Sequence, residues 1–101
     1  MIVFYTDRFI PARFSGYTIF VVILIRPSYF YDRGLLEHEK VHVRQNIRPW
    51  KWFMGRLAKE VEAYKEQLKW YPDDKTHVFA TFIATKYGLD ITVEEAEKLL
   101  R

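Results

Sequence analysis

Leu35 to Gln45 reads LLEHEKVHVRQ, and the rest of the chain must be arranged around this stretch. No Gly or Pro interrupts it and apolar residues recur within it, so the pattern predicts a helix. We expect the helix to run from about Gly34 to Asn46, with Asp32 as its N-terminal cap. His38 and His42 are four residues apart and therefore project from one face, at the separation that a single metal ion requires.

Glu39 directly follows the first histidine and lies about 100° around the helix from it. A carboxylate at this place can reach a water molecule beside the metal without binding the metal itself. His38, Glu39 and His42 thus form a complete HExxH signature in which Glu39 has the position of a general base. The alternative is a solvated helix with two surface histidines, since chance alone produces an HExxH in about one such chain in a hundred. The apolar residues around the motif favour the metal site.

The chain contains no cysteine, so a tightly held transition metal must use histidine and carboxylate ligands. A catalytic zinc ion has three protein ligands and leaves its fourth position to water. The third ligand must come from outside the first helix, and the candidates are carboxylates and His77. We expect His77 to begin a later helix, where a histidine is more often a plain surface residue.

The second predicted helix runs from about Pro49 to Trp70 and offers the best third ligand. Its apolar residues recur at steps of three and four and define a buried face. They are Trp50, Phe53, Met54, Leu57, Val61, Tyr64, Leu68 and Tyr71. Glu60 lies roughly 70° from the centre of this face and Glu62 roughly 130° from it. We therefore expect Glu60 to complete the metal site and Glu62 to be solvated.

The residues before the first helix favour β-strands. Ile2 to Thr6 and Tyr17 to Ile25 are rich in β-branched and aromatic residues. The stretch DRFIPARFSG between them carries a Pro and a Gly and is typical of a loop or an irregular hairpin connection. We expect the two strands to pair antiparallel.

Two further helices are expected after the second one. The first follows the sequence Tyr71-Pro72-Asp73-Asp74 and ends near Gly88. Thr92 and Glu95 then form a capping-box pattern before a short last helix through Leu100. Strands followed by helices predict an α+β fold, with a small N-terminal antiparallel β-sheet or ribbon and three to four helices.

Length and composition limit the class of protein. With 101 residues, the chain has room for a single domain that spans residues 1–101. Its 16 basic residues are interspersed with 13 acidic ones, so we do not expect nucleic-acid binding. The longest apolar run, Ile19 to Ile25, is far too short for a membrane span, and the start lacks a signal-peptide pattern. The sequence therefore predicts a soluble protein of the cytoplasm.

The runs HEKVHVRQ and EVEAYKEQ resemble those of the gluzincin metallopeptidases, whose HExxH helix is completed by a glutamate on a later helix. Glu60 stands at the position of that glutamate. More narrowly, the small size and both runs resemble the minigluzincins, which are similar to the catalytic domains of larger membrane-embedded metallopeptidases. The match covers most of the chain. Tyr64 departs from the pattern, since related families have there an aspartate that orients a metal-binding histidine.

The resemblance implies that the chain hydrolyses peptide bonds in a peptide or protein substrate. Zn²⁺ held by His38, His42 and Glu60 would activate a bound water, and Glu39 would take its proton and pass it to the leaving amine. The resemblance also implies a strand along the cleft that pairs with extended substrate, for which Tyr17 to Ile25 is the natural candidate.

The family includes latent forms. We therefore expect the full-length chain to show weak activity on folded proteins, because a part of the protein covers the cleft. That part is either the last segment, Ile91 to Arg101, or a second copy of the chain in a homodimer.

Two other interpretations remain open. One is a catalytically silent zinc-binding domain, because 101 residues leave little protein for deep specificity pockets. The other is a small basic module that binds nucleic acid through Arg44, Arg48, Trp50, Lys51 and Trp52, although acidic residues scattered among the helices count against it. Metal analysis separates this module from the zinc proteins, and a peptide-cleavage assay separates an enzyme from a silent domain.

Overall fold

The computed structural model describes all residues, 1–101, and its N-terminal part is a three-stranded sheet. Strand β1 (Ile2–Tyr5) pairs in parallel with β3 (Val22–Ile25), and β3 pairs antiparallel with β2 (Gly16–Ile19). The strand order is therefore β1-β3-β2. The predicted α+β class is confirmed, but the sheet is mixed and the expected purely antiparallel pairing is wrong.

The segment that was expected to be one strand, Tyr17 to Ile25, is two strands joined by a tight turn at Phe20 and Val21. Phe20 has a φ of 52°, in the left-handed region, and this reverses the chain within an apolar run. No Gly, Asn or Asp marks the turn, so the strong β-propensity of the run hid it. Because the chain reverses here, β3 runs opposite to β2 and in the same direction as β1. β1 and β3 therefore pair in parallel.

Four helices follow the sheet. They are α1 (Arg33–Ile47), α2 (Arg56–Leu68), α3 (Thr76–Lys86) and α4 (Val93–Leu100). The predicted caps are confirmed, since Asp32 accepts a hydrogen bond from the Leu35 N–H and Thr92 forms a capping box with Glu95. None of the helices is both long and apolar enough to cross a bilayer.

Helix α2 begins later than expected. The residues Pro49–Lys51 form a separate 3-10 turn, and α2 starts only after Gly55. Pro49 suits a first helical turn, as expected, but that helix ends within one turn. The glycine then has an extended backbone as the N-cap of α2. The aromatic residues of this connection therefore do not belong to the apolar face of the helix.

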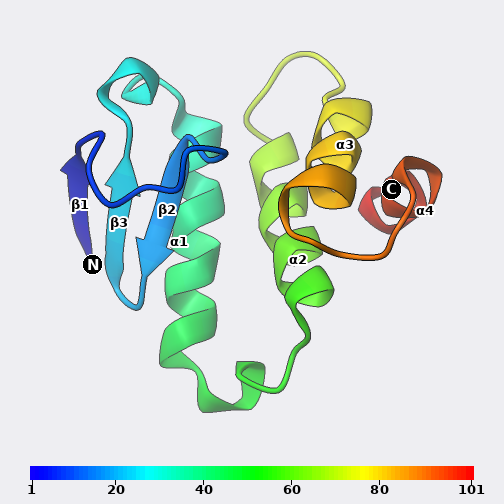
Figure 1. Cartoon of the computed structure of the whole chain (residues 1–101), viewed down its shortest axis with the longest axis horizontal. Coiled ribbons are helices and arrows are strands. Elements are labelled where there is room, and N and C mark those ends of the chain that lie inside the picture. The colour runs from blue at the N-terminus through cyan, green and yellow to red at the C-terminus, as the bar shows by residue number, and fades with distance from the viewer.

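The buried apolar residues form three clusters, two of which lie on either side of the contact between α1 and α2. Figure 1 shows the sheet and α1 on one side, and α2, α3 and α4 on the other. Ile23, Ile25 and Val43 form the core between the sheet and α1. The larger core lies among the other helices and includes Tyr64, Phe79, Ala80, Ile83, Ala96 and Leu100. The predicted metal residues lie where these two halves meet.

The last helix completes the larger core. Ala96 and Leu100 of α4 are buried against Ile83 of α3. None of the residues after Tyr87 lines the cleft described below. The expectation that Ile91 to Arg101 covers the site is therefore wrong. Ala96 is a weak apolar signal in the sequence, but its small side chain allows close packing of the helices.

Gly34 provides a test of the packing at the start of α1. A methyl group on its Cα would lie 2.6 Å from the ring of Tyr71, and hydrogen bonds with Asp32 and Gln67 hold that ring in place. Replacing glycine by alanine within a helix normally stabilises it by about 1 kcal/mol. Here we expect Gly34→Ala to lower the free energy of unfolding by about 1–3 kcal/mol, because the site is overpacked.

Urea unfolding measures this change, and Gly55→Ala is the matched control. A methyl group at Gly55 would meet nothing within 4 Å, so this variant should change stability by no more than about 1 kcal/mol. An unchanged or higher midpoint for Gly34→Ala would show that Tyr71 moves aside at no cost.

Candidate metal centre

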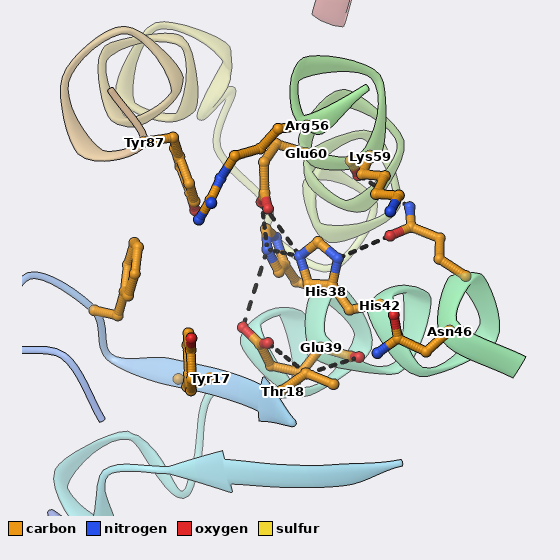
Figure 2. A pocket seen from close by; sticks show the side chains of 13 residues that line it. Tyr17, Thr18, His38, Glu39, His42, Asn46, Arg56, Lys59, Glu60 and Tyr87 are labelled. Carbon is orange, nitrogen blue, oxygen red and sulfur yellow. Dashed lines mark hydrogen bonds and ion pairs between the residues drawn. The ribbon is translucent and has the colours of Figure 1, made fainter. Parts of the chain in front are cut away.

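His38, His42 and Glu60 come together where α1 and α2 cross (Figure 2). The spacing on α1 places the two histidine Nε2 atoms 3.2 Å apart. Glu60 Oε1, from α2, lies 3.2 Å from Nε2 of His42 and 3.4 Å from Nε2 of His38. The three residues predicted as ligands therefore converge on one point.

The triangle of donor atoms has the size of a zinc ligand set. Zinc bonds to histidine nitrogen and to carboxylate oxygen are about 2.0–2.1 Å long, so two ligands of a tetrahedral ion lie about 3.3 Å apart. The three observed separations, 3.2, 3.2 and 3.4 Å, agree with this distance. Two imidazoles and one carboxylate are also a ligand set that catalytic zinc uses. The residues present therefore fit the ion.

The electrostatics of the cluster favour a cation between its members. Burial alone would raise the pKa of Glu60, but hydrogen bonds with His38 and His42 outweigh burial and hold that pKa at about 2. Burial alone would lower the pKa of His42, but the hydrogen bond and charge of Glu60 raise it to about 9. In the metal-free protein, protonated His42 thus supplies the positive charge that a metal ion would otherwise supply.

Zinc binding should consequently strengthen as the pH rises, because His42 must lose its proton to bind a metal. With a pKa of about 9 for His42 in the metal-free protein, the apparent affinity should rise up to about tenfold per pH unit from about pH 7 to 9 and then level off. Competition with a chelator, corrected for the protonation of the chelator, measures this. An affinity that stays constant over the range would show that His42 is already neutral at pH 7.

The effect of rising pH on the stability of the metal-free fold has the opposite sign. The folded-state pKa of His42, about 9, is above its ordinary value of 6.5. Its protonation therefore stabilises the metal-free fold below about pH 6.5, and this stabilisation is lost as the pH rises through about 9.

A chain of hydrogen bonds holds His42. Its Nδ1 donates to Gln45 Oε1 at 2.9 Å, and Gln45 Nε2 donates to Glu62 Oε1 at 2.9 Å. Lys51 in turn donates to Glu62 at 2.6 Å. Although burial opposes it, the bonds from Lys51 and Gln45 keep the pKa of Glu62 below its usual range. Because Gln45 accepts a hydrogen bond from the Nδ1–H of His42, the Nε2 atom of His42 is left to face the centre.

Glu62 thus lies outside the triangle, as predicted, but it is not simply solvated. Through Gln45, it helps to hold the ring of His42 in place. Gln45 was missed by sequence reasoning, although its place three residues after His42 on the same helix is a local signal that could have indicated it.

His38 is oriented by packing. Its Nδ1 is buried and forms no hydrogen bond. The ring of Tyr64 lies against the imidazole, with centroids 4.3 Å apart and planes at 70°. The neighbour of this imidazole is therefore an aromatic ring, at the position where the resemblance implied an orienting aspartate.

Glu39 is buried beside the triangle without joining it. Its Oε2 lies 4.0 Å from Nε2 of His38, and its Oε1 accepts a hydrogen bond of 2.7 Å from the hydroxyl of Thr18. Gly16 of β2 passes so close that a methyl group on it would lie 3.2 Å from Glu39 Oε2. Thr18 and Gly16 were not predicted, because the contact of β2 with α1 depends on the unmarked turn at Phe20.

Two hollows meet at His38 and Glu39. The first, a cleft of about 320 Å³, is bounded by β2, α1, α2 and Tyr87, and Arg56 and Lys59 line its α2 wall (Figure 2). The second, of about 330 Å³, is more apolar. Its lining includes Tyr64, Val78, Phe79 and Phe82. The chain therefore forms more room around the site than its length suggests.

Tyr87 is the hydroxyl that lines both hollows. It lies 2.7 Å from the hydroxyl of Tyr64, and burial, followed by the neighbouring Tyr64, raises the pKa of Tyr87 far above its usual range. His77 is exposed and pairs with Glu97, while Tyr71 bonds to Asp32. His77 therefore lies outside both hollows, as a surface residue.

The arrangement combines three side chains that could hold a metal ion, a separate buried carboxylate and a hydroxyl that stays protonated. These are the groups needed to polarise a carbonyl, to accept a proton from water and to donate a hydrogen bond. Comparison of the chain with protein-family models, with known proteins and with solved structures found no match.

Proposed function

We propose that the chain is a zinc-dependent peptidase of the gluzincin type. His38, His42 and Glu60 would hold the ion, and Glu39 would act as the general base. The observation that carries the proposal is the triangle of three donor atoms, 3.2–3.4 Å apart, with a further carboxylate beside it that does not belong to the triangle. The resemblance of both motifs to those of the minigluzincins supports the same conclusion.

Bound zinc would polarise the scissile carbonyl and lower the pKa of water towards about 7. Glu39 would take the proton, and two contacts support this role: Thr18 holds Oε1, and Oε2 faces the centre at 4.0 Å from His38. It can then pass that proton to the leaving amine. Tyr87, whose hydroxyl remains protonated, can donate a hydrogen bond to the oxygen of the attacked carbonyl.

The position of β2 supports a peptide as the substrate. β2 is an edge strand with β3 as its one neighbour, and its residues Gly16, Tyr17 and Thr18 line the cleft. An edge strand presents unpaired backbone N–H and C=O groups, to which an extended peptide can add. We therefore propose β2, instead of the whole segment Tyr17 to Ile25, as the strand that would pair with substrate.

Removal and return of zinc tests the proposal. We expect about one zinc per purified chain and cleavage of quenched-fluorescence peptides that stops when a chelator removes the metal and resumes when zinc is restored. A chain that binds zinc but cleaves no peptide of a broad library would be a silent zinc domain. A chain that binds no zinc would favour the basic module.

If cleavage is weak, a second copy of the chain is the remaining candidate for covering the cleft, because the last segment packs in the larger core. Latency of this kind should decline as the protein is diluted and dimers dissociate. Light scattering together with activity measured over a dilution series tests this. Weak activity in a protein that is monomeric throughout would exclude a homodimer as its cause.

A further inference from the structure

One end of the molecule carries a group of exposed apolar side chains, which we call the aromatic corner. Its members are Phe20, Ile47, Trp50, Trp52 and Phe53. They come from the β2–β3 turn and from the connection between α1 and α2, which lie together at the lower end of Figure 1. Asn46 joins the two segments, because its side chain donates to the Phe20 carbonyl and its carbonyl accepts from the Trp52 indole.

The exposure of these residues is not explained by the fold. Phe53 is 92% exposed, Trp50 69% and Trp52 58%, although burial of aromatic side chains is strongly favourable. Single exposed apolar residues are normal, but a contiguous group of them marks an interaction site. Phe20, also 58% exposed, has a left-handed backbone that Gly or Asn would adopt more easily. The chain therefore keeps an aromatic ring at this turn against the local backbone preference.

The segment that carries most of the aromatic corner has charges of one sign. The segment from Lys40 to Lys59 contains six basic residues and no acidic one. The six are Lys40, Arg44, Arg48, Lys51, Arg56 and Lys59. Only Lys40 and Lys51 form ion pairs, with glutamates from outside the segment. Arg48 is exposed and forms no ion pair, and Arg44 forms none either, although its charge helps to lower the pKa of Glu62.

We propose that the aromatic corner docks on an anionic lipid surface. Trp50, Trp52 and Phe53 would enter the interface between headgroups and acyl chains, where tryptophan is favoured. Arg44 and Arg48 would meet the lipid phosphates. This inference concerns a surface outside the metal cluster and does not rest on the proposed peptidase activity.

The observations favour lipid over two other partners. A second copy that docked through the same surface would bring Arg44 and Arg48 of the two copies together, and Glu62, the acid beside Arg44, is already paired with Lys51. A single-stranded nucleic acid would be held by stacking on flat rings and by phosphate contacts, and neither explains the exposed aliphatic side chain of Ile47. The purely apolar side chains of Ile47 and Phe53 gain free energy when they are transferred from water into hydrocarbon.

Vesicle co-sedimentation tests the proposal. We expect the full chain to sediment with vesicles of phosphatidylcholine that contain phosphatidylglycerol, to bind pure phosphatidylcholine much more weakly, and to bind less as salt is added. Tryptophan emission should shift to shorter wavelength on binding. The variant Trp50→Ser/Phe53→Ser should lower the partition coefficient by at least about tenfold, and Arg48→Glu should lower it for anionic vesicles only.

Phe30→Ser/Tyr31→Ser is the matched control. Phe30 is 71% and Tyr31 72% exposed, and they follow the turn Pro27–Tyr29 at the other end of the molecule (Figure 1). This control should bind vesicles like the parent chain, and circular dichroism should show that each variant is folded.

Three results would overturn the proposal. The first is failure of the parent chain to bind anionic vesicles, and the second is an equal loss of binding in the control. The third is that the corner variants affect only single-stranded oligonucleotide binding or only self-association, which would assign the surface to that partner.

Discussion

Glu60→Ala is expected to lower the zinc affinity of the chain by more than about a hundredfold, whereas Glu62→Ala should retain about one zinc per chain. Loss of a residue that supports a ligand costs about 10- to 100-fold in metal affinity, and loss of a charged ligand should cost more. Glu60 Oε1 lies within 3.4 Å of both histidine Nε2 atoms. Glu62 reaches the site only through Gln45 and His42, so its loss should weaken binding by about tenfold at most.

Elemental analysis and a chelator competition measure both variants. The pair is well matched, because both glutamates are on α2, two residues apart, and both have depressed pKa values. His38→Ala and His42→Ala should behave like Glu60→Ala. If Glu62→Ala lost its zinc while Glu60→Ala kept it, the ligand assignment would be wrong.

The second large effect is expected for Glu39→Gln, which should keep its zinc but turn over peptides about a hundred to ten thousand times more slowly. The amide has the shape of the carboxylate and can still accept the hydrogen bond from Thr18, which the carboxylate accepts at 2.7 Å. It lacks the basic oxygen that takes a proton from water. Proton transfer by a positioned group contributes about this factor to a rate.

Glu37→Gln is the control for this experiment. Glu37 is a buried glutamate of the same helix, and it pairs with Arg33 and Lys40 without lining the cleft. The control should cleave peptides at nearly the parental rate. Activity of Glu39→Gln close to that of the parent would remove Glu39 from the mechanism, even if the zinc site is correct.

The parts of the site that were predicted depend on local geometry. The four-residue spacing of His38 and His42 determines their common face as soon as a helix is assumed. Glu60 could be distinguished from Glu62 because both lie within the part of the predicted helix that is helical, where 100° per residue applies. The late start of α2 did not affect this argument.

The parts that were missed depend on contacts between segments far apart in the chain. The parallel pairing of β1, and the contact of Thr18 with Glu39, both follow from the turn at Phe20. No residue there signals a turn, so propensity alone favours a continuous strand. Tyr87 could not be placed either, since it reaches the cleft only after α3 has packed against α2.

The three candidate ligands lie on either side of the boundary between two apolar clusters, so a bound ion would hold the two parts of the chain together. His38 and His42 belong to the half formed by the sheet and α1, and Glu60 to the half formed by the other helices. An ion that binds only the folded chain adds to its stability about 4 kcal/mol when its free concentration is a thousand times the dissociation constant. A bound zinc ion would thus connect two small halves of a protein that has no disulfides. Because a lower zinc supply would leave more of the chain unfolded, it would also shorten the time that the chain survives proteolysis.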